Sequence, residues 1–248
     1  MAVDSDGNLY VADFRNNQID RITPGGSTSV FADLTTAGFP AASPTGLVFL
    51  GSNLYVAGNG DNQLLKITPG GSVSSFATLP GSGPFSLAVD STGNFYTADS
   101  TDNHITKISA DGSTVSMFAT VGGGVYGLAL DGAGNVYAAA DLGGAIDVFD
   151  PTGLSLGNFG SNYPHNFFPE GLTFDNTGNL DVADGGNGNL LQFNSTGTSQ
   201  SVFAPTSGSF IGGVNFVAFS PTPEPGSAAL MALGAAAVLG WRRRSFRA

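Results

Sequence analysis

The sequence contains no cysteine in its 248 residues. A disulfide framework, a thiolate metal site and a cysteine nucleophile are therefore excluded together. Helical hydrophobic periodicity is also absent before residue 226, whereas glycine is abundant at 37 residues. Short apolar runs separated by glycine-containing turns are typical of many short strands, so we predict an all-β fold.

Basic residues are scarce, with only eight Lys and Arg side chains in the chain. Four of them stand in the last seven residues, namely Arg242, Arg243, Arg244 and Arg247. Residues 1–221 hold the other four against 18 acidic side chains, a net charge of −14. A body of this charge repels phosphate backbones, so we expect no nucleic-acid partner.

The main feature that is present is a repeat. The segment Gly7–Asp13 (GNLYVAD) recurs in variant form four times, at 52–58, 93–99, 134–140 and 178–184. The shared asparagines are 45, 41, 41 and 44 residues apart: Asn8, Asn53, Asn94, Asn135 and Asn179. A period above 40 residues with four apolar runs per copy predicts four-stranded propeller blades and excludes helical solenoids.

The third copy shows the predicted plan of one blade. We expect strands at 87–90, 95–99, 104–108 and 115–119, with turns at 90–94 and 110–113. Because both faces of a blade pack on neighbouring blades, the Phe, Val and Leu residues of these strands are predicted to be core.

The repeats define the predicted domain organisation. Five complete repeats occupy about 1–34, 46–79, 86–121, 127–160 and 171–204, and 213–221 matches the first strand of a sixth. We therefore predict a propeller over 1–221 and a separate tail over 222–248. Met1 stands where Leu87 and Leu128 stand in later copies, inside an innermost strand. We expect a truncated parent or a misplaced start codon, with a five-bladed ring and a spare strand as the alternative.

The blades resemble NHL repeats and the related SMP-30/gluconolactonase-like propellers. The residues that carry this resemblance are Leu87–Asp99 (LAVDSTGNFYTAD) followed by Asn103, His104 and Ile105. The resemblance covers roughly residues 1–220 and implies the fold, but unrelated activities share this scaffold.

The tail has three parts in a fixed order: Pro223, Glu224 and Pro225, then an apolar stretch over 226–241, then Arg242, Arg243 and Arg244. This order resembles the PEP-CTERM tail, which implies an exosortase-type processing enzyme as partner. Sixteen helical residues span about 24 Å, less than the roughly 30 Å hydrocarbon core, which suits a segment that inserts transiently and is then cleaved. Arginines on the cytoplasmic side would leave the propeller exported, at the cell envelope or outside the cell. An ordinary tail anchor and an amphipathic surface helix are the alternatives.

The resemblance to lactonases and lyases implies an active site at the mouth of the central channel, often with a divalent metal. The matching positions, just before each first strand, are Thr45, Phe85, Tyr126, Glu170 and Gly212. Glu170 is the only charged ligand among them and thus the candidate catalytic residue. Calcium takes six to eight oxygen ligands, which this set does not supply, so we expect no metal there.

The turns that begin at Asp4, Asp90, Asp131 and Asp175 suggest calcium as a cofactor. However, an Asp that opens a turn accepts backbone hydrogen bonds in any hairpin, so we interpret these residues as structural. His104 and His165 have no second histidine near them in sequence and are expected to have no catalytic or ligand role.

These observations leave two functional hypotheses. The leading one is a non-enzymatic binding or structural propeller, exported to the envelope or to extracellular polysaccharide, whose ligand is a protein or a glycan. The alternative is a metal-dependent lactonase- or lyase-like enzyme centred on Glu170.

Overall fold

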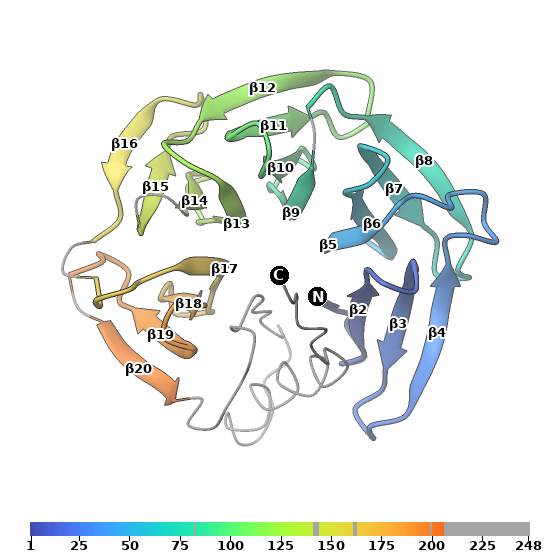
Figure 1. Ribbon diagram of the computed structural model, residues 1–248, viewed down its shortest axis with the longest axis horizontal. Coiled ribbons are helices and arrows are strands. Elements are labelled where there is room, and N and C mark those ends of the chain that lie inside the picture. The colour runs from blue at the N-terminus through green and yellow to red at the C-terminus, as the bar shows by residue number, and fades with distance from the viewer. Residues whose placement is uncertain (82, 141–143, 161–162, 199, 206–248) are drawn as a thin grey trace, which may run out of the picture.

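The computed structural model describes residues 1–81, 83–140, 144–160, 163–198 and 200–205. These residues form five antiparallel sheets of four strands each, so the predicted propeller blades are confirmed. Within each sheet the strands follow chain order from the innermost to the outermost. The sheets are arranged around a central axis as a five-bladed propeller (Figure 1).

The strand bounds repeat from blade to blade. Blade one consists of β1 (Ala2–Val3), β2 (Leu9–Asp13), β3 (Gln18–Ile22) and β4 (Thr28–Asp33). Blade two consists of β5 (Pro44–Leu50), β6 (Asn53–Gly58), β7 (Gln63–Ile67) and β8 (Val73–Thr78). Blade three consists of β9 (Pro84–Val89), β10 (Phe95–Asp99), β11 (His104–Ile108) and β12 (Val115–Thr120). Blade four consists of β13 (Val125–Leu130), β14 (Val136–Ala140), β15 (Ala145–Phe149) and β16 (Ser155–Asn158). Blade five consists of β17 (Pro169–Phe174), β18 (Leu180–Asp184), β19 (Asn189–Phe193) and β20 (Gln200–Pro205).

The hairpin between the first and second strands is organised by one carboxylate. Oδ1 of Asp90 accepts hydrogen bonds from the backbone N–H groups of Thr92 and Asn94, and Oδ2 accepts from Asn94 Nδ2 at 2.9 Å and from Tyr96 at 3.2 Å. Asp4, Asp131 and Asp175 accept equivalent backbone and asparagine bonds. The predicted structural role of these four aspartates is thus confirmed.

Neighbouring blades are joined by aromatic side chains. Tyr10 in β2 packs edge-on against Phe31 of its own blade and against Phe49 of blade two, with ring centroids 4.9 and 5.1 Å apart. Tyr137 repeats the arrangement with Phe159 and with Phe174 of blade five. Such pairs add to the hydrophobic burial between blades and confirm the strand aromatics as core.

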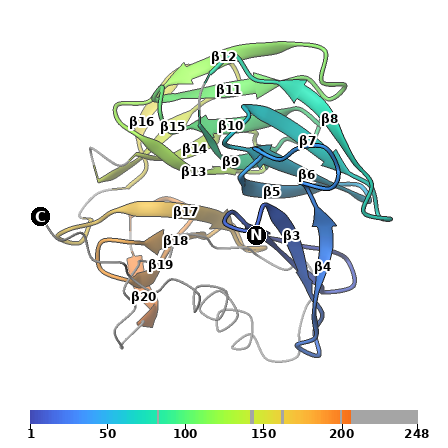
Figure 2. The ribbon, with the colours of Figure 1, turned by 45° about the vertical axis from the view of Figure 1, so that its right-hand side comes forward.

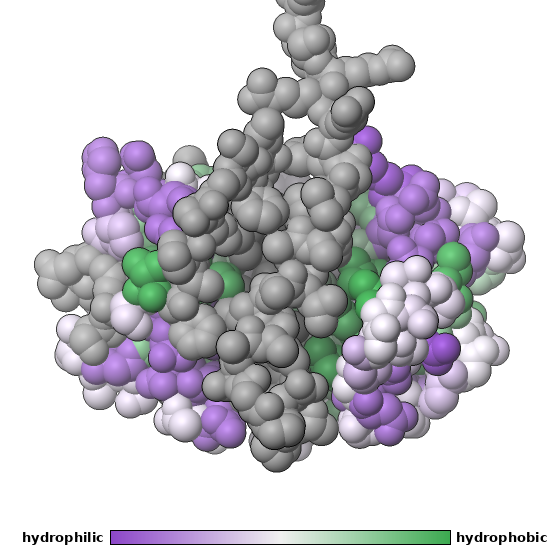
Figure 3. Space-filling view, turned by 90° about the horizontal axis from the view of Figure 1, so that it is seen from below, coloured by the Kyte–Doolittle hydropathy of each residue, from purple (hydrophilic) through white to green (hydrophobic). Residues whose placement is uncertain are grey.

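Blade one is less well covered than the others. In blades two and three the side chains that face the preceding blade are buried, with Leu54, Phe95 and Ile108 at most 1% exposed. Their counterparts in blade one, Leu9 and Ile22, are only half-buried. Blades one and five stand apart in the ring (Figures 1 and 2), and hydrophobic residues lie at this edge of the molecule (Figure 3).

Several predictions fall on residues outside the described part of the chain. These are the single strand of a sixth repeat at 213–221, Gly212, the apolar stretch at 226–241 and the sorting residues Pro223, Glu224, Pro225, Arg242, Arg243 and Arg244. Among the described residues, the structure contains no helix with the length and apolar character needed to cross a membrane.

Candidate functional site

The innermost strands of blades two to five each carry a β-bulge at the end where the chain enters the central channel. In blade three, Pro84 pairs with Asp99 and Ser86 with Ala98, which leaves Phe85 as the extra residue. Tyr126 and Glu170 are the extra residues of blades four and five. In blade two, Thr45 and Gly46 together stand opposite one residue, Ala57.

The bulges contain all four described residues that the sequence predicts for the channel mouth. The expectation that these residues precede the strands is wrong, because the bulge lets pairing continue past them. Blade three shows the difference: β9 begins at Pro84 and ends at Val89, whereas the predicted strand began at Leu87. A bulge bends its strand and redirects the extra side chain. Among these four residues, Glu170 also lines the cavity of the channel.

Glycine after the bulge allows neighbouring innermost strands to approach closely. A Cβ on Gly46 would lie 2.7 Å from the backbone nitrogen of Leu87, and a Cβ on Gly127 would overlap the carbonyl oxygen of Glu170. The channel is therefore bordered by closely packed backbone, and only residues without a side chain fit at these two positions.

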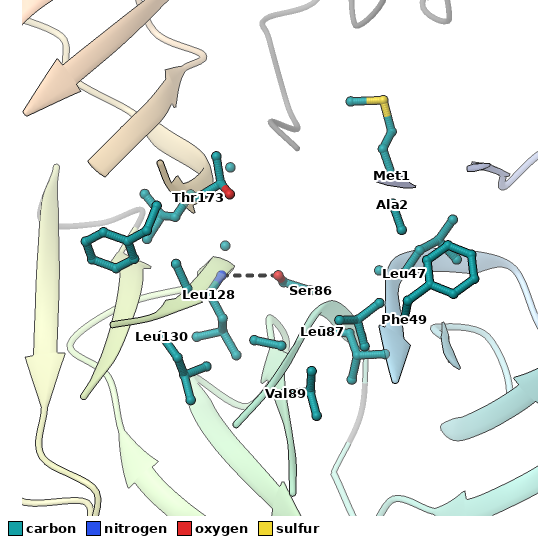
Figure 4. A pocket seen from close by; sticks show the side chains of 18 of the residues that line it. Met1, Ala2, Leu47, Phe49, Ser86, Leu87, Val89, Leu128, Leu130 and Thr173 are labelled. Carbon is teal, nitrogen blue, oxygen red and sulfur yellow. Dashed lines mark hydrogen bonds between the residues drawn. The ribbon is translucent and has the colours of Figure 1, made fainter. Parts of the chain in front are cut away.

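The innermost strands of all five blades line a cavity of about 400 Å³ in the central channel. Leucines from one repeat position line it, namely Leu47, Leu87, Leu128 and Leu172, each less than 10% exposed. Ser86 also lines it, but its hydroxyl oxygen accepts a hydrogen bond from the backbone N–H of Leu128 at 3.1 Å and so joins blades three and four (Figure 4).

Thr45 serves the structure of the mouth. Its side chain is buried, and Oγ1 lies 2.9 Å from the carbonyl oxygen of Pro84 and 3.3 Å from that of Ala57. The hydroxyl therefore donates to the backbone at the junction of blades two and three. Because the Thr45 hydroxyl donates within the protein, we do not count Thr45 among the residues that present a polar atom to a ligand.

Phe85 and Tyr126 form an aromatic pair across the junction of blades three and four. Their ring centroids are 5.2 Å apart and the rings are nearly perpendicular, at 88°. Both residues are half-buried, so each exposes part of its surface to solvent. The edge-to-face arrangement fixes the two rings relative to each other.

Glu170 adds the carboxylate of the mouth and also lines the cavity. Its Oε2 atom is buried, although the residue as a whole is only half-buried. The carboxylate rests against Gly185, where a Cβ would lie 2.7 Å from Cδ and from Oε1. Glu170 therefore points from β17 toward the first residue after β18.

A buried carboxylate beside His104 is a feature that the sequence analysis missed. Nε2 of His104 lies 3.6 Å from Oδ2 of Asp99, which is 1% exposed, and Nδ1 lies 3.0 Å from the carbonyl oxygen of Asp102. Burial raises the pKa of Asp99, and hydrogen bonds from Thr106 and Thr97 oppose the rise. An available signal was that an aspartate ends the second strand in three blades, at positions 13, 99 and 184.

The remaining candidate histidine, His165, lies in the loop that precedes β17. His165 is exposed, and its carbonyl oxygen accepts a hydrogen bond from Asn187 Nδ2 at 3.0 Å. Among the described residues, the structure shows no cluster of three or more His, Asp and Glu side chains suited to a metal ion. Among the four described mouth residues, only Glu170 has a carboxylate. These residues therefore do not supply the six to eight oxygen ligands that calcium takes.

Comparison with known proteins identifies the tail and the fold. Residues 221–244 match the family model of the PEP-CTERM protein-sorting motif. No curated protein matches the sequence. Among solved structures, virginiamycin B lyase from Staphylococcus aureus is 19% identical with a TM-score of 0.66, and the match covers 81% of this chain and 67% of the lyase chain.

Two further structures show how widely the fold is shared. A gluconolactonase from Xanthomonas campestris is 18% identical with a TM-score of 0.68, over 82% of this chain and 74% of its own. A chain of a nidogen/laminin complex is 17% identical with a TM-score of 0.68, over 80% and 76%. At these identities the similarity is one of fold, which does not determine function.

The motif implies export, association with the envelope and processing by an exosortase. The chain is therefore a PEP-CTERM exosortase substrate whose β-propeller is similar in fold to virginiamycin B lyase and to the SMP-30/gluconolactonase propellers.

Proposed function

We propose that the exported propeller is a non-enzymatic binding protein that holds a glycan at the channel mouth. The observation that carries this proposal is the bulge ring, formed by the bulge residues Thr45, Phe85, Tyr126 and Glu170. Phe85, Tyr126 and Glu170 hold the same position in the innermost strands of three successive blades. Aromatic faces pack against the C–H faces of sugars, and a carboxylate accepts hydrogen bonds from their hydroxyl groups. The mouth combines both kinds of contact.

The charge of the propeller narrows the glycan class. Residues 1–221 carry a net charge of −14, which repels uronate-rich and phosphorylated polymers. We therefore propose a neutral or amino-bearing polysaccharide as the ligand. This choice agrees with the export to the cell envelope that the sorting motif implies.

We propose that the tail determines where the protein is located and takes no part in glycan binding. We propose that 222–248 inserts transiently in the membrane, that exosortase processing follows, and that 1–221 folds independently of it. Deletion of residues 223–248 is expected to leave the strand circular-dichroism signal intact and, in the source bacterium, to send the protein into the medium. Loss of the strand signal would contradict an independent propeller.

The experiment that tests the binding proposal is titration of the purified protein with extracellular polysaccharide from the source strain. Phe85→Ala and Tyr126→Ala are each expected to weaken binding roughly 3- to 10-fold, the range of one aromatic contact. Met117→Ala is the control, because Met117 is a large hydrophobic residue on the outermost strand β12 with 66% of its surface exposed. Equal affinities for all four proteins, or no binding by any, would refute the proposal.

A second candidate, a metal-dependent lactonase- or lyase-like enzyme, is favoured by one observation, the defined position of the Glu170 carboxylate. We expect no hydrolysis of sugar lactones and no rise in melting temperature with calcium, zinc or manganese, since a ligand specific to the folded state would raise it. A rise of several degrees with one metal, abolished by Glu170→Gln, would favour the enzyme instead.

A further inference from the structure

Gly185 lies next to the carboxylate of Glu170. Gly185 is the first residue after β18, and a Cβ built on it would lie 2.7 Å from Cδ and Oε1 of Glu170 and 3.0 Å from Oε2. Real Cβ atoms do not make contacts this short. The carboxylate therefore occupies the volume that a side chain at 185 would fill.

This arrangement is specific to blade five among the blades where the position is described. The residues at the same place in blades one, two and three are Phe14, Asn59 and Ser100, all with side chains. Glu170 is also the only glutamate in residues 1–205. Blade five thus combines the single glutamate of the described blades with a glycine that makes room for its carboxylate.

We propose that Gly185 is the positioning residue of the channel mouth: its missing side chain holds the Glu170 carboxylate inward, where it accepts hydrogen bonds from a hydroxyl or ammonium group of the bound sugar. This inference rests on the proposed glycan-binding function. It adds a second residue that determines specificity, one that does not touch the ligand itself.

The substitution Gly185→Ala is expected to move the Glu170 carboxylate without disrupting the fold. Gly185 is not among the residues with positive φ, so alanine is compatible with its backbone. The obstacle is the far end of a flexible side chain, which can rotate away at low cost. At the neighbouring Gly186 a Cβ would instead overlap the carbonyl oxygen of Asn166, where the backbone itself would have to move.

The small number of glutamates allows Glu170 to be observed directly by NMR. Glu170 and Glu224 are the only glutamates, so a protein labelled with ¹³C at glutamate Cδ gives two signals. In Gly185→Ala we expect the Glu170 signal and its titration midpoint to change, while the Glu224 signal stays constant. Gly122→Ala is the control, because nothing lies within 4 Å of a Cβ there. An unchanged Glu170 signal in Gly185→Ala would overturn the proposal.

Binding provides the second readout. Gly185→Ala and Glu170→Gln are expected to weaken polysaccharide binding by similar factors, and the double variant by no more than either. Additive losses would contradict positioning through Glu170. If the wild type binds no polysaccharide but the Glu170 signal still moves in Gly185→Ala, the positioning inference stands and the proposed function fails.

A third variant covers the case in which Gly185→Ala lowers the melting temperature. If the loss comes from the clash with Glu170, Glu170→Ala in the same protein removes the clash and restores the melting temperature. Failure of Glu170→Ala to restore it would show that Gly185 acts on the fold by another route and would overturn the inference.

Discussion

Two aspartates show how local contacts give the same side chain opposite properties. Asp90 opens the β9–β10 turn; burial raises its pKa, but hydrogen bonds from Asn94 and Thr92 outweigh this and bring the pKa to about 2. Asp181 occupies in blade five the position that tyrosine holds in the other blades. Burial raises its pKa to about 6 despite a hydrogen bond from Gln192 Nε2 at 2.9 Å.

Asp90→Asn is expected to lower the melting temperature at pH 7. The native pKa lies below the ordinary aspartate value of 3.8, so the ionised carboxylate stabilises the fold above about pH 4 and loses this effect as the pH falls toward 2. The loss of charge-assisted bonds costs about 1–2 kcal/mol. Melting curves across this range should show the gap between wild type and variant closing at low pH; a gap independent of pH would contradict the assignment.

Asp181→Asn is expected to have the opposite effect at pH 7. The native pKa of Asp181 lies above the ordinary aspartate value, so ionisation opposes folding, and this penalty develops as the pH rises from about 4 to 6. An asparagine keeps an oxygen that accepts from Gln192 and carries no charge. The variant should melt higher than wild type at pH 7 and equally at pH 4. A lower melting temperature at pH 7 would be the contrary result.

At the scale of the strands, the repeat predicted most of the structure. The second and third strands of blade three lie where the apolar runs placed them, because local residues encode the neighbouring turns, as Asp90 does for the β9–β10 turn. The bulges were not predicted, since one extra residue in a strand leaves no gap in an apolar run. Aligning the repeats located the mouth positions. The hydrogen bond from Thr45 to Pro84 and the contact of Glu170 with Gly185 could not be predicted, because they join segments that only folding brings together.

The close approach of innermost strands leads to a prediction for Gly127. Gly127→Ala places a methyl group against the carbonyl oxygen of Glu170, which belongs to the backbone and cannot rotate away. Overpacking of this kind typically costs about 1–3 kcal/mol. Denaturant unfolding should show this loss, whereas Gly132→Ala, with nothing within 4 Å of its Cβ, should remain near wild type. Equal stability of the two variants would show that the strands are free to separate.

At the scale of the whole molecule, stability should vary around the ring. Blades three and four are covered on both sides by neighbouring blades, whereas the outward face of blade one is half-exposed and that of blade five carries Asp181. In repeat architectures each unit is stabilised mainly by its neighbours. Amide hydrogen exchange should therefore be slow over 95–98 and 136–139 and faster in β2, β3 and β19. Uniformly slow exchange would instead show that the outward faces of blades one and five are as well protected from solvent as the faces of the other blades.

The central claim is that the bulge ring at the channel mouth binds a neutral or amino-bearing glycan. Hydrogen exchange of the full chain, with and without extracellular polysaccharide from the source strain, tests it most directly. The account predicts slower exchange on binding at 84–87, 125–128 and 169–172, with the outer strands β8 and β12 unchanged. Protection confined to the outer strands, or no protection at a concentration that saturates binding, would contradict it.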